Sequence, residues 1–260
     1  MSDTDSASPP VLSIDGPRAT IRLNRPKHLN RLLADDLATL LGQFEQIDTD
    51  PSIRVLVLTG TGRAFSGGFD LDEIAARATS ETDSESSAAA FGAVVDRLED
   101  LRVPTICRLN GGVYGGATDL ALACDFRIGA DSAEMFMPAA RLGLHYYPSG
   151  IKRYVTRLGV DNAKKMFLTA QRIDAAEMLR IGYLTTMVPM DRLDREVDAL
   201  ATTLAGHAPN AVAGMKRAIN EFARQAFDEA AADARSRASM RSQEIREGIA
   251  AFTEKRAPRF

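Results

Sequence analysis

Residues 104–123 read PTICRLNGGVYGGATDLALA, in which an apolar run is followed by a glycine-rich turn and then by a helical run. An apolar run that does not alternate with polar residues is typical of a strand buried on both faces of a parallel sheet. Glycines let the backbone turn sharply and approach a ligand closely, and the first turn of a helix presents N–H groups without helical partners. The stretch therefore predicts a strand, a tight turn with accessible amides, and a helix.

A second segment of the same kind lies earlier in the chain. The apolar run Ile53–Leu58, broken only by Arg54, predicts another buried strand, and the residues FSGGFDL follow it at 65–71. A third strand is expected at Asp125–Ala130. Strands that alternate with helices indicate an α/β fold. Two glycine turns that each lead from a strand into a helix could direct two N–H donors at one oxygen atom.

The N-terminal part supplies an edge to this sheet. Val11–Ile14 and Arg18–Leu23 alternate apolar and polar residues around an Asp-Gly pair, which predicts a β-hairpin. From Leu33 onward, apolar residues recur at helical spacing until Pro51, which predicts an amphipathic helix.

Two later segments depart from the alternation of strands and helices. Residues 75–87 are rich in Ser, Thr, Asp and Glu without apolar periodicity, which predicts a mobile loop. Ala211–Arg256 is helical in composition and period, with Asn210 as the expected N-cap. We therefore expect a core domain over residues 1–200 and a helical domain over residues 201–260.

Composition excludes several classes of protein. The chain has 260 residues, of which 45% are hydrophobic and 26% charged, as is ordinary for a globular domain with a large core. Its net charge of −3 argues against nucleic acid as a partner. It has two cysteines and no apolar run long enough for a membrane span or a signal sequence, so we expect a cytoplasmic protein without membrane attachment.

Several familiar catalytic motifs are absent from the sequence. The dinucleotide fingerprint fails because Phe65 stands where its third glycine is required, and no phosphate-binding loop ends in Lys followed by Ser or Thr. Neither Ser66 nor Ser149 lies in a hydrolase nucleophile turn. The three histidines have no metal-ligand spacing, so we predict no metal site.

The two glycine segments, in this order, resemble those of the crotonase superfamily, also called the enoyl-CoA hydratase/isomerase family. The similarity spans nearly the whole chain. It includes LNRP at 23–26, VLTG at 57–60, Cys124-Asp125, and AFTEKR at 251–256.

The resemblance implies a crotonase-like α/β fold, a spiral of ββα units, with a C-terminal helical domain for oligomerisation into a homotrimer or a dimer of trimers. It also implies an acyl-CoA thioester substrate, so that coenzyme A enters with the substrate and no separate cofactor is needed. The thioester oxygen would lie between the amides of Phe69 and Gly116. Such donors stabilise the enolate more than the ground state, and one is worth about 3 to 4 kcal/mol.

The carboxylates of this sequence depart from the pattern of the family's hydratases, which use two glutamates. Asp119 stands at the first position and Ala139 at the second. General acid–base catalysis contributes about 10²- to 10⁴-fold, so this gap disfavours hydration. Tyr147 stands where some relatives have an aspartate. The sequence around Tyr146 resembles the methylmalonyl-CoA decarboxylase branch, in which this tyrosine would orient the substrate carboxylate.

We therefore expect a lyase that decarboxylates a malonyl-type CoA, since loss of carbon dioxide creates the enolate without a base. One alternative is an enoyl-CoA hydratase or isomerase in which Asp119, with His145 or Tyr146, transfers protons. Another is a catalytically degenerate acyl-CoA-binding protein. Each side chain also has an alternative structural role: Asp119 could serve merely as a salt-bridge partner, and the tyrosines could merely pack in the core.

Further residues are expected to contact the substrate. Three basic residues would meet the CoA phosphates, Asp70 would cap the helix after the first glycine turn, and Phe252 and Lys255 would reach the CoA of a neighbouring subunit. The complete predicted substrate-binding set is Arg25, Lys27, Arg63, Gly67, Gly68, Asp70, Leu71, Tyr114, Gly115, Ala139, His145, Tyr147, Phe252 and Lys255.

Overall fold

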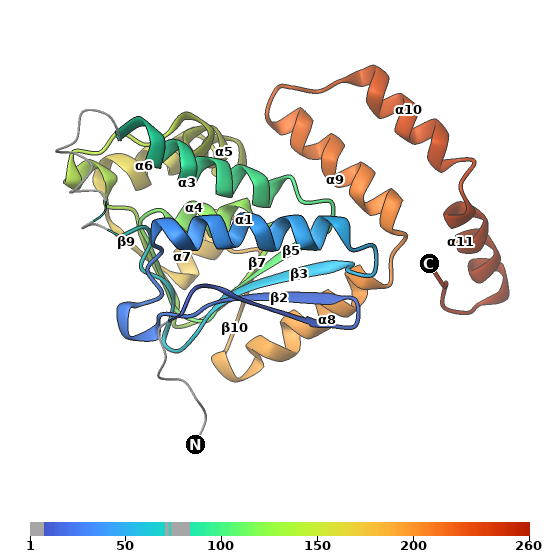
Figure 1. The fold of residues 1–260 in the computed structure, drawn as a ribbon, viewed down its shortest axis with the longest axis horizontal. Helices are drawn as coiled ribbons and strands as arrows, with labels where there is room; N and C mark the ends of the chain where they lie inside the picture. Colours follow the sequence, from blue (N-terminus) through green and yellow to red (C-terminus); the bar gives the residue numbers. More distant parts are fainter. Residues whose placement is uncertain (1–7, 71–72, 74–83) are drawn as a thin grey trace.

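The computed structural model describes residues 8–70, 73 and 84–260 (Figure 1). Its larger sheet contains, in spatial order, β1 (Val11–Asp15), β2 (Arg18–Leu23), β3 (Val55–Gly60), β5 (Thr105–Leu109), β7 (Phe126–Ala130) and β10 (Thr186–Val188). Its smaller sheet contains β4 (Ala64–Ser66), β6 (Gly112–Tyr114), β8 (Glu134–Phe136) and β9 (Arg172–Asp174).

Successive pairs of strands wind the chain into a spiral. β3 and β4, then β5 and β6, then β7 and β8 each place one strand in the larger sheet and the next in the smaller. Neighbouring strands are parallel except in the pairs β1–β2 and β8–β9. This arrangement confirms the predicted spiral of ββα units, and the β1–β2 hairpin confirms the predicted edge.

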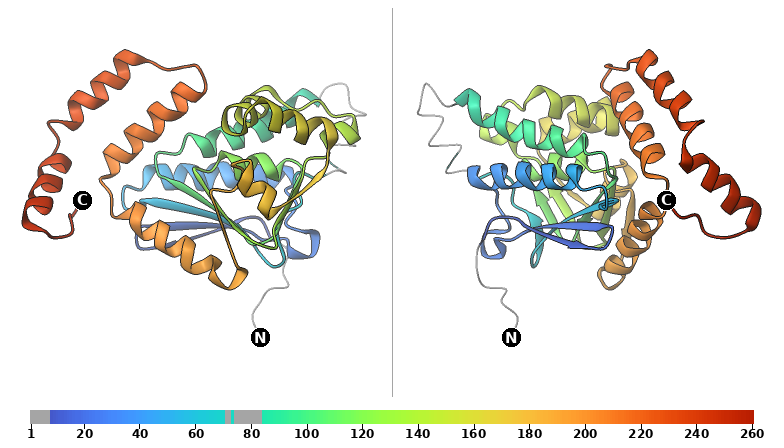
Figure 2. Two further views of the ribbon diagram at one scale, coloured as in Figure 1. Left: turned by 180° about the vertical axis from the view of Figure 1, so that it is seen from behind. Right: turned by 45° about the vertical axis from the view of Figure 1, so that its right-hand side comes forward.

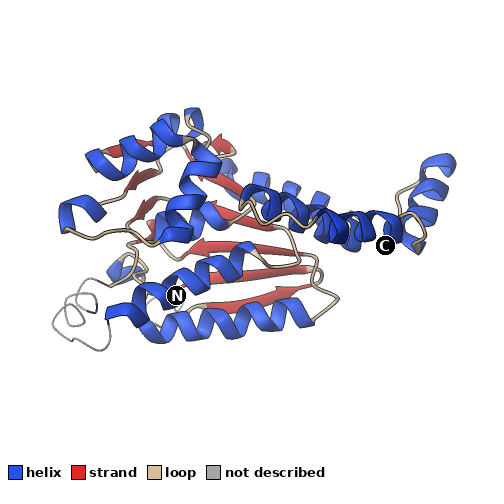
Figure 3. Cartoon of the chain, turned by 90° about the horizontal axis from the view of Figure 1, so that it is seen from above, coloured by secondary structure: helices blue, strands red, loops and turns tan. Residues whose placement is uncertain are grey.

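The sequence of strand β3 is almost entirely apolar because both of its faces are buried. Leu56 and Leu58 pack on one face, in the large core that includes α1 (Ala34–Thr49) and α3 (Ser84–Glu99). Val55 and Val57 face the other side, where they pack with residues of α8 (Leu193–Ala205). Helices thus cover both faces of the larger sheet, with α1 and α3 above its strands and α8 below them in Figure 1, as expected for buried parallel strands. Figure 3 shows the strands side by side.

Two asparagines hold the turn between β3 and β4. The side-chain amide of Asn30 donates to the carbonyls of Thr61 and Ala64 at 2.8 and 2.9 Å. The side-chain amide of Asn110 donates to the carbonyl of Gly62 at 2.7 Å, and its Oδ1 accepts from the Gly60 amide at 3.3 Å. These bonds satisfy buried backbone groups that no ladder reaches, and they fix the start of the first glycine segment.

Two local predictions were wrong. α3 begins at Ser84, so the last part of the segment predicted as a loop, residues 84–87, is helical; residues 75–83 lie outside the described part of the chain. Asn210 is not an N-cap, because α9 begins one residue earlier, at Pro209. Proline favours the first helical position, where its missing N–H is not needed.

Three helices form a C-terminal arm that projects from the body of the molecule (Figures 1 and 2). They are α9 (Pro209–Ala223), α10 (Glu229–Ser239) and α11 (Gln243–Glu254). α9 and α10 contain no buried residue, and α11 contains only Ala251. The predicted division between residues 200 and 201 falls inside α8, which packs on the larger sheet.

The other helices of the described residues lie within the body. They are η1 (Pro26–His28), α4 (Ala117–Ala123), η2 (Ala139–Leu142), α5 (Pro148–Leu158), α6 (Val160–Thr169), α7 (Ala175–Arg180) and η3 (Met190–Arg192). Two of them, α4 and α5, carry side chains of the candidate site. Within the described residues, no helix combines the length and the apolar character that crossing a membrane requires.

Candidate active site

The two glycine segments lie in direct contact. Gly68 has a φ of +90°, and a Cβ atom placed on it would lie 2.6 Å from the carbonyl oxygen of Tyr114 and 3.1 Å from the amide nitrogen of Gly116. Only glycine permits both this conformation and this approach. The neighbouring residue, Phe69, is held in a parallel bridge with Leu32. The structure therefore brings Gly68, the residue before Phe69, next to Gly116. That the amides of Phe69 and Gly116 bind one oxygen atom stays a prediction.

Gly116 is the N-cap of α4, with φ −57° and ψ −28°. No described residue accepts a hydrogen bond from its amide, whereas the Gly115 amide donates to the carbonyl of Phe136 at 2.8 Å. A Cβ atom on Gly116 would lie 2.9 Å from Cζ of Phe91, so an aromatic ring borders the turn. An amide at this position, next to the N–H groups of the first helical turn, is suited to bind an anionic oxygen.

Asp119 lies one helical turn beyond Gly116 and is completely buried. Its Oδ2 accepts hydrogen bonds from the Tyr147 hydroxyl and from Nη1 of Arg153, the latter at 2.7 Å. Its Oδ1 has no partner among the described residues. Burial raises the pKa of this carboxyl, while Arg153 and Tyr147 act in the opposite direction. One carboxylate oxygen is thus held, and the other is buried without a partner among the described residues.

The Tyr146 hydroxyl is the second buried polar group at this site without a described partner. Its ring stacks on Tyr147 at 4.5 Å between centroids and contacts Phe167 at 5.1 Å. Burial, and then the nearby Asp119, raise the pKa of Tyr146 well above its ordinary value. The hydroxyl is therefore neutral near pH 7 and can donate a hydrogen bond.

Tyr147 acts differently from its neighbour, because its hydroxyl is already bonded to Asp119. Its ring meets Phe91 edge to face at 6.1 Å, and Phe91 meets Phe69 in the same way. These aromatic side chains form a continuous apolar wall beside the Gly116 turn. Such a wall excludes water and favours an apolar part of a substrate.

Ala139 and His145 differ in their exposure to solvent. Ala139 is buried at the start of η2, and its methyl group supplies no acid or base. His145 is exposed in the segment between η2 and α5. Of the side chains considered for proton transfer, Asp119 and Tyr146 are buried beside each other: a Cβ atom on Gly150 would lie within 3 Å of both.

The three basic residues predicted to meet CoA phosphates differ in their surroundings. Arg25 forms a two-pronged pair with Asp36, with Nη2 at 2.9 Å from Oδ1 and Nε at 3.1 Å from Oδ2. Lys27 lies on η1. Arg63 is exposed in the turn between β3 and β4. Arg25 therefore has a structural role, whether or not it also meets a phosphate.

Two further predicted residues have identifiable partners. Oδ1 of Asp70 accepts a hydrogen bond from the Glu73 amide at 3.2 Å, as a capping side chain does, and its Oδ2 lies 2.6 Å from Arg31. The Tyr114 hydroxyl donates to Glu134 at 2.8 Å. Leu71 lies outside the described residues.

Phe252 and Lys255 lie on the arm rather than at the glycine turns. Phe252, on α11, is 87% exposed, and Lys255 follows as the exposed C-cap. α11 lies apart from the body in every view (Figures 1 and 2). A role for them at the site of a neighbouring copy stays a prediction.

Arg153 is a site residue that the sequence did not reveal. It holds Asp119 from α5, a helix that begins well after α4 in the chain. A single arginine in an amphipathic helix carries no local signal of a buried partner.

Among the described residues, the structure brings together no group of His, Cys, Asp and Glu side chains suited to a metal ion.

Known proteins resemble this chain over nearly its whole length. The sequence pattern of the enoyl-CoA hydratase/isomerase family matches residues 17–260. A probable enoyl-CoA hydratase of Mycobacterium tuberculosis is 34% identical over 242 residues, covering 92% of this chain and 93% of the relative. The 2,3-dehydroadipyl-CoA hydratase of Escherichia coli is 30% identical over 242 residues, with the same coverage.

A solved structure also superimposes over nearly the whole chain. It is an enoyl-CoA hydratase from Bacillus anthracis, with a TM-score of 0.88 and 30% identity, and the match covers 97% of this chain and 99% of that one. The similarity therefore includes the arm as well as the body.

Proposed function

The chain belongs to the enoyl-CoA hydratase/isomerase family, within the crotonase superfamily, and on that premise we propose that it acts on the carbon–carbon double bond of a 2-enoyl-CoA thioester, by hydration or isomerisation. This is the alternative that the sequence left open. The preference for decarboxylation finds no support among the relatives compared, whose names describe hydratases.

The observation that carries the proposal is the position of Asp119, a buried carboxylate one turn beyond Gly116 with Oδ1 unpartnered among the described residues. In hydration, this oxygen accepts a proton from water as the water oxygen bonds to C3 of the enoyl group. The double-bond electrons move onto the thioester oxygen, which the amides of Phe69 and Gly116 stabilise. The same carboxyl then returns the proton to C2.

Isomerisation uses the same groups without water. Asp119 removes a proton beside the conjugated system, the charge moves onto the thioester oxygen, and the carboxyl returns the proton to another carbon. A single carboxyl suffices for either route, so Ala139 does not prevent the chemistry. Coenzyme A enters as part of the substrate, and we propose no resident cofactor.

The test is a side-by-side assay of the purified protein with crotonyl-CoA, methylmalonyl-CoA and ethylmalonyl-CoA. We expect turnover of crotonyl-CoA, and Asp119→Asn should reduce it about 10²- to 10⁴-fold, because proton transfer is lost while the side-chain volume is kept. Binding of all three thioesters without turnover would contradict the proposal and favour an acyl-CoA-binding protein.

Decarboxylation is a second candidate because of the unpartnered Tyr146 hydroxyl. A buried donor without an acceptor is costly unless a ligand uses it, and a malonyl carboxylate would be a suitable acceptor. In this reaction the bond to the carboxylate carbon breaks, its electrons move to the thioester oxygen, and carbon dioxide leaves.

Tyr146→Phe separates the two candidates. If the hydroxyl orients a carboxylate, the variant should lose methylmalonyl-CoA decarboxylation while its thermal stability is kept or increased, since an unsatisfied buried hydroxyl has been removed. If the tyrosine only packs, turnover should not change. Rapid crotonyl-CoA hydration by a protein inactive on both malonyl-type substrates would exclude this second candidate.

We further propose that the chain assembles as a homotrimer or a dimer of trimers. The exposed apolar residues of the arm support this, because a monomer rarely leaves so many large apolar side chains in water. They are Met215, Ile219, Phe222, Phe227, Met240, Ile249 and Phe252. Light scattering of the eluting protein should give three or six times 28.1 kDa, and a monomer at assay concentration would contradict the assembly.

A further inference from the structure

Arg153 connects the candidate active site to charges on a different helix. Its guanidinium is almost completely buried and faces three carboxylates: Nη1 lies 2.7 Å from Asp119, Nη2 lies 2.5 Å from Asp96, and Nε lies 3.2 Å from Glu99. Asp96 and Glu99 belong to α3. One cation is therefore shared between the site carboxylate and two acids that lie outside the site.

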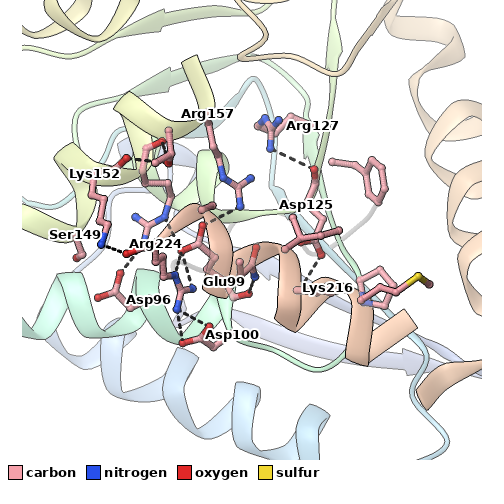
Figure 4. Close-up of a pocket in the computed structure, with 18 of the residues that line it drawn as sticks. Asp96, Glu99, Asp100, Asp125, Arg127, Ser149, Lys152, Arg157, Lys216 and Arg224 are labelled. Carbon is pink, nitrogen blue, oxygen red and sulfur yellow. Dashed lines mark hydrogen bonds and ion pairs between the residues drawn. The ribbon is translucent and has the colours of Figure 1, made fainter. Parts of the chain in front are cut away.

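Glu99 is in turn shared by three cations. Its Oε1 lies 2.8 Å from Arg157 of α5, and its Oε2 lies 2.8 Å from Nη2 of Arg224. The side-chain amide of Asn220, on α9, donates to the backbone carbonyl of Glu99 at 2.9 Å. Figure 4 shows Arg157 and Arg224 approaching Glu99.

Helix α9 of the arm thus reaches this network by direct contacts. Asn220 lies on it, and Arg224 is its C-cap. A cavity of about 690 Å³ lies between α9 and the body. The helix is attached across it by the polar contacts of Asn220 and Arg224 with Glu99, and by the ion pair of Lys216 with Asp125 at 2.8 Å. Moving α9 would remove a positive charge from Glu99.

Burial makes these contacts electrostatically strong. Glu99 is 6% exposed and Asp119 is not exposed, so water and salt screen the interaction between them weakly. Both carboxylates compete for Arg153. A change in the charge around Glu99 must therefore alter how strongly Arg153 holds Asp119.

We propose that Arg153 is a positioning residue that holds one oxygen of Asp119 and leaves the other for the substrate, and that helix α9 adjusts this hold through Arg224 and Glu99. The inference rests on the proposed proton-transfer function of Asp119. If this proposal holds, the position of α9 in the arm changes the pKa of Asp119 in the same chain.

The direction of the effect follows from the charged and titratable groups around Asp119. They are Arg153 with Tyr146, Tyr147 and Tyr154 from α5 and the segment before it, Asp96 and Glu99 from α3, and Tyr183 beyond α7. Glu99→Gln removes a competing anion, so Arg153 stabilises ionised Asp119 more strongly. Arg224→Gln leaves Glu99 less neutralised, with the opposite result.

The direct test measures the titration of Asp119 by carbon NMR of protein labelled at aspartate carboxyls, with Asp119→Asn to identify its signal. We expect Glu99→Gln to lower the midpoint and Arg224→Gln to raise it, each by about one pH unit or less. Arg217→Gln is the matched control, because Arg217 lies on the same helix but pairs with Glu221 at the surface. It should leave the midpoint unchanged.

Activity provides the second readout. The acidic limb of the kcat profile against pH should move in the same two directions, with little change in KM, and Arg224→Lys should restore most of the original profile because the charge is kept. A variant that was only less stable would not shift the profile in a direction set by charge.

The two proposals can fail separately. If no enoyl-CoA is turned over, the proposed function fails and the NMR titration still tests the coupling. The coupling is overturned if the Asp119 midpoint does not move, if both variants move it in one direction, or if Arg217→Gln moves it as much as Arg224→Gln.

Discussion

The body and the arm of this chain differ in how far their large apolar side chains are buried. In the body, large side chains such as Phe44, Phe65 and Tyr154 are completely buried. In the arm, Phe222 and Phe252 are 71% and 87% exposed. Both regions contain well-formed helices, so the difference lies in packing rather than in secondary structure.

Because of this difference in burial, the two regions are stabilised by different interactions. Burying apolar area is the main term that offsets the conformational entropy lost on folding, and the body has a hydrophobic core on each face of its larger sheet. The arm has polar anchors to the body, such as Lys216 and Arg224. The body is therefore stabilised by its own core, whereas the large apolar side chains of the arm stay exposed in the single chain.

The largest effect should come from the body, at Gly116. Proline there removes the amide hydrogen, and the observed φ of −57° is one that proline adopts. We expect kcat to fall about 10²- to 10³-fold, the loss that accompanies removal of one oxyanion donor. Steady-state kinetics on the preferred enoyl-CoA, with circular dichroism to check folding, measures this.

Gly116→Ala is the matched control for that experiment. It keeps the amide and adds a Cβ atom 2.9 Å from the Phe91 ring edge, so it reports the steric part of the loss. Equal activity in the two variants would show that the Gly116 amide does not bind the oxyanion.

The next effect compares one phenylalanine in each region. Phe44→Ala should lower the free energy of unfolding by about 3 to 5 kcal/mol, because it leaves a cavity in the core of the body. Phe252→Ala should change it by only about 0.5 kcal/mol or less in dilute protein. Denaturant titrations at low and high protein concentration measure both.

Protein concentration sharpens this comparison. If the arm meets another copy, the effect of Phe252→Ala should grow with concentration while that of Phe44→Ala stays constant. An effect of Phe252→Ala that is large and independent of concentration would mean that the arm packs within its own chain.

The smallest effect is the pH response of two surface ion pairs. Arg180 and Lys165 in the body, and Arg256 with the Arg259 amide in the arm, lower the pKa of Glu177 and of Glu247 to about 2. A lowered folded-state pKa means that each pair stabilises fully above the ordinary value of 4.5 and ceases to do so as the pH falls through about 2.

Amide hydrogen exchange near each pair, in Glu177→Gln and Glu247→Gln, tests this. Each variant should exchange faster than the original protein above pH 4.5, and the difference should vanish as the pH falls through about 2. High salt should also reduce the difference. If the regions are independent, Glu247→Gln leaves exchange in the body unchanged. Faster exchange throughout the body would contradict the separation of the two regions.

Periodicity and turn chemistry predicted the body well because those signals are local. The hairpin at residues 11–23 and the buried strand at β3 follow from alternation, an Asp-Gly turn and an unbroken apolar run. Periodicity did not locate the strands of the smaller sheet, since β4, β6, β8 and β9 have three residues each and show no period. Only their pairing in space makes them strands.

In the candidate site, too, local features could be predicted from the sequence and contacts between distant elements could not. The glycine turns could be found in the sequence because a close backbone approach requires residues without a Cβ atom. The roles of Arg153 and Glu99 could not, because each depends on partners from other helices. The start of α3 at Ser84 was also missed, since a polar segment at a helix start resembles a loop in composition.

The contact between Gly68 and Gly116 has a consequence for how such enzymes diversify. Every amino acid except proline carries an amide hydrogen, so residue 69 can exchange its side chain without altering the main-chain group assigned to the thioester. The phenyl ring there contacts Phe91, at the edge of the aromatic wall. Under the proposed function, single substitutions at residue 69 would change the acyl pocket while keeping the main-chain donor for the thioester oxygen.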